Sequence, residues 1–180
     1  MERCRMVFSG SGGQGVITAA IILAEAAVLY ENLNAVQSQS YGAAARGGAT
    51  RSDIVIADTV IHFPKVIQPN VLVCLTQEAY NAYYAIIRPG GLLLTDTRYV
   101  KTGKKVDARQ VELSMYRNVV DTIGKPIVFN ICMLGAIVSL TNLVTSESIL
   151  KVLENRIPSG FIEMNRRALE LGMELGAQNR

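Results

Sequence analysis

Two kinds of apolar pattern alternate along the chain. Short runs rich in apolar and β-branched residues, typical of strands in a buried sheet, predict strands at residues 5–9, 34–39, 52–57, 71–75 and 92–95. Apolar residues three or four positions apart predict a helix at residues 13–30. Further helices are predicted at 77–87, around 115–122, at 131–144, which is apolar nearly all round, and at 146–156, after the possible N-cap Thr145. The alternation of strand and helix indicates an α/β fold, a three-layer α/β/α sandwich of Rossmann-like type with a mainly parallel sheet.

Three segments need a separate interpretation. Residues 52–57 and 60–63 flank the possible turn Asp58-Thr59, so we predict one antiparallel hairpin there. We expect His62, in its second strand, to be packed or hydrogen-bonded rather than a general base, because no acidic partner is in sight. Residues 106–128 are ambiguous apart from their helix, and we expect one strand at their start and another at 126–129. A last apolar stripe predicts a helix that packs on the protein's own core rather than on a partner; its residues are Phe161, Met164, Ala168, Leu171 and Leu175.

Composition excludes several classes of protein. The chain has 180 residues, a length typical of a single domain, and 49% hydrophobic against 18% charged residues excludes disorder. A net charge of +3, spread along the chain, gives no indication of nucleic-acid binding. The longest apolar segments, 19–30 and 131–144, are shorter than the roughly 18 residues that a membrane span requires, so we expect no membrane insertion.

Residues that often carry chemistry are few. Cys4, Cys74 and Cys132 are far apart in the sequence, which excludes iron–sulfur spacing and predicts reduced thiols in the cytoplasm. His62 is the single histidine, which argues against a zinc site of histidines and against a Ser-His-Asp triad. Asp96 ends a predicted strand and either faces a ligand or closes a turn. This chain therefore lacks most of the usual catalytic side chains.

The first predicted strand leads into a glycine-rich loop. Gly10, Ser11, Gly12, Gly13, Gln14 and Gly15 match the pattern G-x-G-x-x-G between a strand and a helix, where backbone N–H groups can bind an anion. The alternative is a tight turn in which glycine only allows close packing. An NAD site needs an acidic residue at the end of the second strand, and residues 33–40 contain none. No Lys-Ser/Thr pair follows the loop, which excludes a Walker-type phosphate site.

A second unusual segment follows the second predicted strand. It contains Ser40, Tyr41 and Gly42, then Arg46, Gly47 and Gly48. In a parallel sheet both loops would emerge at the carboxyl ends of the strands, where ligands usually bind. The Arg46 guanidinium could bind a phosphate or carboxylate, or the segment could be a flexible surface loop whose arginine is solvated.

These motifs together resemble a known family. The glycine loop, Gln39-Ser40-Tyr41-Gly42 and Arg46-Gly47-Gly48 are similar to the gamma subunit of 2-oxoacid:ferredoxin oxidoreductases. The stretches 76–80 and 88–92 and Asn130 at the start of an apolar helix extend the resemblance over nearly the whole chain. The sequence of the second loop resembles the 2-oxoglutarate and branched-chain classes more than the pyruvate class.

The resemblance implies that residues 1–180 form one gamma-type domain without a redox group. The complex would decarboxylate a 2-oxo acid, transfer the acyl group to coenzyme A and reduce ferredoxin. Thiamine diphosphate and iron–sulfur clusters would belong to the alpha, beta and delta subunits, and the isolated chain could form a homodimer. Both glycine-rich loops would then complete the active site or the coenzyme A path. The family pattern has Pro-Glu where this chain has Ala43-Ala44, so no role of that carboxylate transfers.

Two other functions remain open at this point. A freestanding nucleotide-binding protein of Rossmann type would use the glycine loop but needs the missing acidic residue. An interface or assembly module would use both loops only to shape a contact surface.

Overall fold

A computed structural model describes residues 3–40 and 49–180. Its six-stranded sheet has the order β2-β3-β1-β4-β5-β6. The strands are β1 (Cys4–Gly10), β2 (Asn34–Ser40), β3 (Thr50–Ala57), β4 (Val71–Cys74), β5 (Gly91–Asp96) and β6 (Ala108–Leu113). β1, β4, β5 and β6 pair in parallel, whereas β3 lies antiparallel between β2 and β1. The mainly parallel α/β sheet is thus confirmed.

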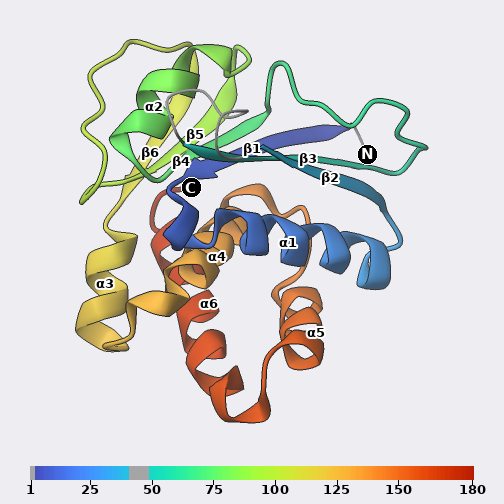
Figure 1. Ribbon diagram of the computed structural model, residues 1–180, viewed down its shortest axis with the longest axis vertical. Helices are drawn as coiled ribbons and strands as arrows, with labels where there is room; N and C mark the ends of the chain where they lie inside the picture. Colours follow the sequence, from blue (N-terminus) through green and yellow to red (C-terminus); the bar gives the residue numbers. More distant parts are fainter. Residues whose placement is uncertain (1–2, 41–48) are drawn as a thin grey trace.

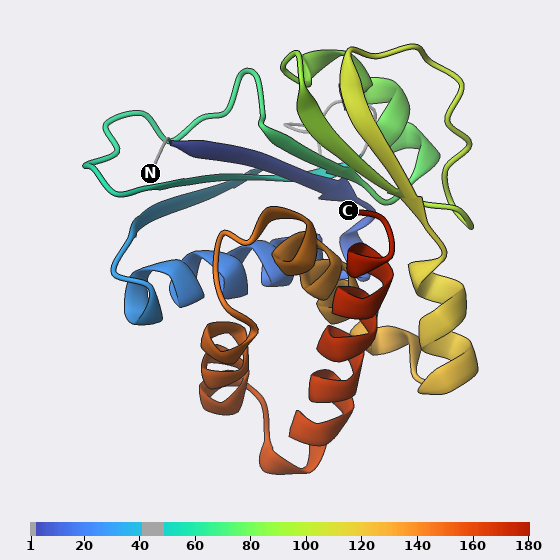
Figure 2. The ribbon, with the colours of Figure 1, turned by 180° about the vertical axis from the view of Figure 1, so that it is seen from behind.

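Helices cover both faces of the sheet. The α-helices are α1 (Val16–Tyr30), α2 (Gln77–Tyr83), α3 (Met115–Thr122), α4 (Phe129–Thr141), α5 (Ser146–Arg156) and α6 (Ile162–Ala177). Short 3₁₀ turns are η1 (Gly12–Gln14), η4 (Tyr84–Ile86), η5 (Pro126–Val128) and η6 (Ser159–Phe161). α2 lies on one face, whereas α1, α4, α5 and α6 lie on the other (Figures 1 and 2). Each face has its own apolar core, as a three-layer sandwich requires.

Helix α4 is the central helix of the thicker layer, and every residue from Phe129 to Ser139 is buried. It lies very close to α6 because glycines occupy the contact. A Cβ added at Gly135 would collide with the carbonyl oxygen of Leu169, and one added at Gly172 would collide with that of Cys132. Backbone therefore packs directly against backbone at this crossing.

Both ends of α5 are tied to α1 and the turn that follows it. At the start of α5, the Glu31 carboxylate accepts hydrogen bonds from the Thr145 N–H at 2.7 Å and from the Ser148 hydroxyl at 2.6 Å. At its end, Arg156 forms an ion pair with Glu25. These polar contacts hold α5 beside α1, although the two helices are far apart in the sequence.

The predicted hairpin is wrong in its second strand. Residues 60–63 form no strand, because β3 already pairs on both sides, with β1 and with β2. The segment instead crosses the face of the sheet, where the Val66 N–H donates to Asp53 at 2.9 Å. His62 is consequently exposed rather than packed. The antiparallel pairing exists, but its partners are β1 and β2.

Two other predictions can be compared with the structure. The strand expected at 126–129 is wrong: Pro126, which has no N–H to donate to a sheet, begins the 3₁₀ turn η5. The packing of the last helix on the core is confirmed, although Phe161 is 55% exposed. The most buried side of α6 is shifted by one position and contains smaller residues, Asn165, Ala168, Leu169, Gly172 and Gly176. Of the helices described, none is both long and apolar enough to cross a membrane.

The glycine contact between α4 and α6 gives a stability prediction. Alanine usually stabilises a helix interior by roughly 0.5–1 kcal/mol over glycine. We expect the opposite sign for Gly172→Ala, a loss of about 1–3 kcal/mol in the free energy of unfolding, because the new methyl group meets α4 backbone. Urea unfolding measures the change. The control is Gly160→Ala, because an added Cβ there meets nothing within 4 Å. Equal changes in the free energy of unfolding for the two variants would contradict the close contact.

Candidate functional site

The chain changes direction between β1 and β4. From β1 it passes through α1 to β2 on one side of the sheet, and from β4 it passes through α2 to β5 on the other. The loops that follow these two neighbouring strands therefore separate at the carboxyl end of the sheet. A crevice at such a switch point is the usual ligand site of open α/β sheets.

The glycine loop, residues 10–15, lies at this crevice. It forms the turn η1 and ends at Gly15, whose φ of +70° is in the left-handed region. The Asn130 side-chain amide at the start of α4 donates to the Gly15 carbonyl at 3.3 Å. A Cβ at position 15 would lie 2.6 Å from that amide nitrogen. Both the backbone conformation and the close approach of α4 therefore require glycine at this position.

Gln14 closes the crevice. Its side-chain oxygen accepts the Ser11 N–H at 2.9 Å, and its amide group donates to the Leu75 carbonyl, just beyond β4, also at 2.9 Å. A Cβ at Gly10 would lie 2.5 Å from the Gln14 oxygen. A side chain thus bridges the two loops where a dinucleotide would bring its pyrophosphate, which argues against the NAD interpretation.

Beside the loop is a hollow of about 660 Å³. Ser11, Gly13 and Gln14 border it on one side. On the other side is an aromatic wall, formed by Tyr99, Tyr116 and Phe129, whose ring centroids are 5.2–6.1 Å apart. The Arg98 guanidinium lies 4.8 Å from the Tyr116 ring centroid, and none of the described residues that line the hollow is acidic. Backbone donors, apolar rings and one nearby cation suit an anionic guest with an apolar part.

Asp96 is at the end of β5 and is fully buried. Its carboxylate accepts the N–H of Arg98 at 2.9 Å and that of Tyr116 at 2.8 Å. Burial raises the pKa of this carboxyl above its ordinary value, opposed by these backbone donors. Of the two roles open to it, Asp96 takes the structural one: it closes the turn after β5 and anchors the start of α3.

Some of the predicted site residues lie within the described part of the chain, and the others lie outside it. Gly10, Gly12, Gly13, Gln14 and Gly15 form the loop described above. Ser40, the last residue of β2, lies at the same end of the sheet. It pairs with Arg51 of β3, and the neighbouring residue Thr50 pairs with Gly10. Tyr41, Gly42, Arg46, Gly47 and Gly48 lie outside the described residues.

The sequence alone did not point to the far wall of the hollow. Tyr99, Tyr116 and Phe129 come from three separate segments of the chain. They form one wall because their rings pack together in the folded protein. Asn130 offered a weak signal, a polar amide at the start of a helix that is otherwise apolar. Arg51, near the second loop in sequence, forms an ion pair with Asp53 at 2.6 Å.

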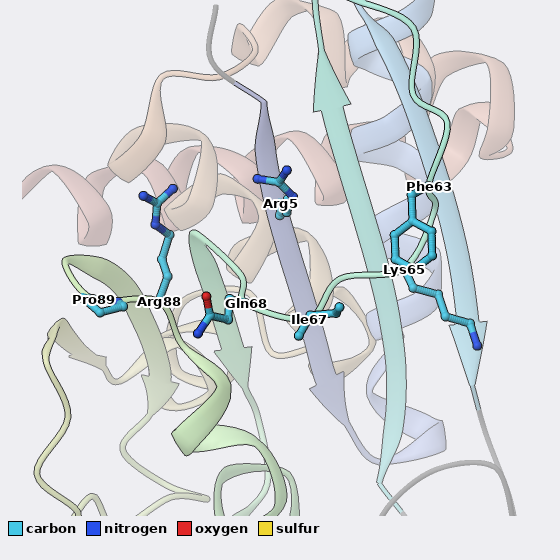
Figure 3. A pocket seen from close by; sticks show the side chains of 7 residues that line it. All are labelled: Arg5, Phe63, Lys65, Ile67, Gln68, Arg88 and Pro89. Atoms are coloured by element: carbon cyan, nitrogen blue, oxygen red, sulfur yellow. The ribbon is translucent and has the colours of Figure 1, made fainter.

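Elsewhere in the described chain the structure offers little reactive chemistry. A second hollow of about 660 Å³ lies at the amino end of β1, far from the glycine loop, and is lined by Arg5, Phe63 and Arg88 among others (Figure 3). Burial raises the pKa of Cys4 to about 11 and that of Cys132 to about 12, so both thiols stay protonated. In residues 3–40 and 49–180, no three His, Cys, Asp or Glu side chains gather to hold a metal ion.

The bridge made by Gln14 can be tested by its removal. Gln14→Ala deletes the acceptor of the Ser11 N–H and the donor to Leu75, so we expect a loss of about 1–3 kcal/mol in the free energy of unfolding. Chemical denaturation measures it, and the exposed Gln110→Ala is the control. A loss no greater than that of the control would show that the bridge contributes nothing to stability.

The sequence was compared with protein families and with known proteins. Residues 5–175 match the model of the family described as pyruvate ferredoxin/flavodoxin oxidoreductase. The 2-oxoglutarate synthase subunit KorC of Methanocaldococcus jannaschii is 47% identical over 172 residues, which cover 94% of this chain and 92% of the relative.

Solved structures give the same result. The gamma subunit of a keto/oxoacid ferredoxin oxidoreductase from Geobacter sulfurreducens superposes with a TM-score of 0.91 at 38% identity and covers 99% of both chains. A 2-oxoglutarate:ferredoxin oxidoreductase from Magnetococcus marinus shares the fold, with a TM-score of 0.86 at 17% identity, over 99% of this chain and 32% of that one. This chain therefore belongs to the pyruvate ferredoxin/flavodoxin oxidoreductase family, among the gamma subunits of 2-oxoacid:ferredoxin oxidoreductases.

Proposed function

We propose that the chain serves an enzyme that converts 2-oxoglutarate and coenzyme A to succinyl-coenzyme A and carbon dioxide. The two electrons released would reduce ferredoxin. The observation that carries this proposal is the 47% identity to a 2-oxoglutarate synthase subunit along almost the full length of both chains. The Magnetococcus marinus enzyme, which has the same fold in part of its chain, was solved with 2-oxoglutarate, coenzyme A and succinyl-coenzyme A bound.

In this proposal the chain supplies shape and hydrogen-bond donors rather than a reacting group. Gly10, Gly12, Gly13, Gln14, Gly15 and Ser40, with Tyr41, Gly42, Arg46, Gly47 and Gly48, complete the active site or the coenzyme A path. The turn η1 and the start of α1 favour negative charge, because unpaired N–H groups gather there. Among the residues that the structure describes, no acidic side chain lines the hollow beside them, so none there would repel an anion.

The redox cofactors would belong to other subunits. A gamma subunit works within a complex, and we assign thiamine diphosphate and the iron–sulfur clusters to alpha, beta and ferredoxin-like delta subunits. Residues 1–180 would act as one domain, and free thiols at Cys4, Cys74 and Cys132 suit a reducing cytoplasm. The isolated chain would form a homodimer and would not turn over substrate.

One alternative keeps some support. An assembly module would use the glycine loop only to shape a contact with a sister subunit, and the tight Gly15–Asn130 contact fits that role as well. The freestanding nucleotide-binding protein is disfavoured by the Gln14 bridge across the crevice.

A single negative charge introduced into the glycine loop distinguishes an anion-binding site from a surface that only contacts another subunit. An added Cβ at Gly13 meets nothing within 4 Å, so this position accepts a side chain without displacing its neighbours. In the assembled complex, Gly13→Asp should raise the KM for coenzyme A at least about tenfold by repelling its phosphates. The matched control Gly13→Asn has the same shape without the charge and should change KM much less. Equal effects of both variants would contradict an anion site.

A second variant tests the arginine. Arg46→Ala should lower kcat/KM of the reconstituted complex by about tenfold or more, as expected for the loss of a charged hydrogen bond, while the subunits still co-purify. Arg117→Ala, on exposed α3, is the control and should leave both properties unchanged. Loss of co-purification in Arg46→Ala alone would favour the assembly module.

A further inference from the structure

Strand β2 forms an open edge of the sheet. Its seven residues pair with β3 in an unbroken antiparallel register, from Asn34 opposite Ala57 to Ser40 opposite Arg51. Within the described residues, no strand pairs with its other side, and Figure 1 shows this edge uncovered. Every second residue of β2 therefore directs its N–H and C=O outward, a row of groups that another strand can use.

This edge lacks the features with which proteins usually prevent strand pairing. Residues 34–40 contain no charged residue and no proline, and the register shows no bulge. The opposite edge, β6, differs: it carries Arg109 and Glu112, and the Arg109 side chain donates to the carbonyl of Asn179 near the end of the chain. One edge of the sheet is thus protected, whereas the other is left open.

Exposed apolar side chains flank the open edge on both faces. Phe63 and Ile67, which are 56% and 73% exposed, line the same hollow as Ser38. Figure 3 shows the segment that carries Phe63 crossing in front of β2 and β3. On the other face, Val28 and Leu29 in the last turn of α1 are 47% and 61% exposed. Phe63, Val28 and Leu29 are therefore exposed apolar residues near this strand, whereas Ile67 lies over β1 (Figure 3).

We propose that β2 pairs with β2 of a second copy of this chain, antiparallel about a two-fold axis at Gln37, so that two sheets become one. The strand complements itself in this register. Val36 lies opposite the partner's Ser38, and Ala35 lies opposite the partner's Gln39, so no like charges meet between the two paired strands themselves. A symmetric contact of this kind is the commonest way in which identical chains associate.

The apolar flanks determine whether such a dimer is stable. A seven-residue ladder alone buries less than the roughly 1,200–2,000 Å² of a stable interface. Phe63 on one face and Val28 and Leu29 on the other extend the contact beyond the strands. Their exposure in the single chain is removed when the second copy pairs.

The oligomeric state of the full chain tests the proposal. Light scattering after gel filtration should show a dimer for the wild type. Ser38 lies beside the axis, so Ser38→Lys brings two charges together and should weaken dimerisation at least about tenfold. Gln110→Lys, at an exposed position of β6, is the matched control and should remain dimeric. A monomeric wild type, or a Ser38→Lys variant as dimeric as the control, would overturn the proposal.

Cross-linking tests the register and does not depend on the lysine variant. Residues directly opposite in an antiparallel pair have Cα atoms about 4.5–5.5 Å apart, within reach of a disulfide. Gln37→Cys should therefore form a covalent dimer under mild oxidation, whereas Asn34→Cys, about 20 Å from its counterpart in this register, should not. Failure of Gln37→Cys to cross-link, or equal cross-linking of both variants, would overturn the pairing. Neither measurement uses activity, so both are independent of the proposed function.

Discussion

The site depends on the close packing of α4 against α6. Gly135 and Gly172 allow the two backbones to touch, and this contact holds α4 in the middle of the thicker helical layer. Because α4 is held there, its first residues reach the glycine loop: Asn130 donates to Gly15, and Phe129 joins the aromatic wall. The loop is therefore supported from behind by a buried helix as well as by its own glycines.

This support fits the proposed role, in which the chain supplies shape and hydrogen-bond donors to an enzyme complex. Gln14 holds the loops after β1 and β4 together, so the loop keeps its shape without a bound nucleotide. On the other side of the hollow, the buried Asp96 also holds the backbone in place, because it anchors the turn after β5 and the start of α3. A preorganised surface of backbone donors can act on an anion held by another subunit, because orientation itself contributes to catalysis.

The two edges of the sheet differ in charge and in the contacts that cover them. β6 carries charges and a contact from the chain end, whereas β2 is neutral, regular and bordered by exposed apolar side chains. The hollow beside the glycine loop lies at the carboxyl ends of the central strands. Association through β2 would therefore leave the glycine loop open to other subunits.

The sequence by itself determined the features that arise from neighbouring residues. The N-cap Thr145 placed the start of α5 where it is observed, and the glycine pattern located the turn before α1. Tertiary structure alone decided the position of β3, because strand pairing joins segments that are distant in the chain. It also decided the crossing of Gln14 to Leu75 and the meeting of Asn130 with Gly15, contacts that span 61 and 115 residues. Local pattern carries no information about such partners, since they meet only when the helices and strands have packed.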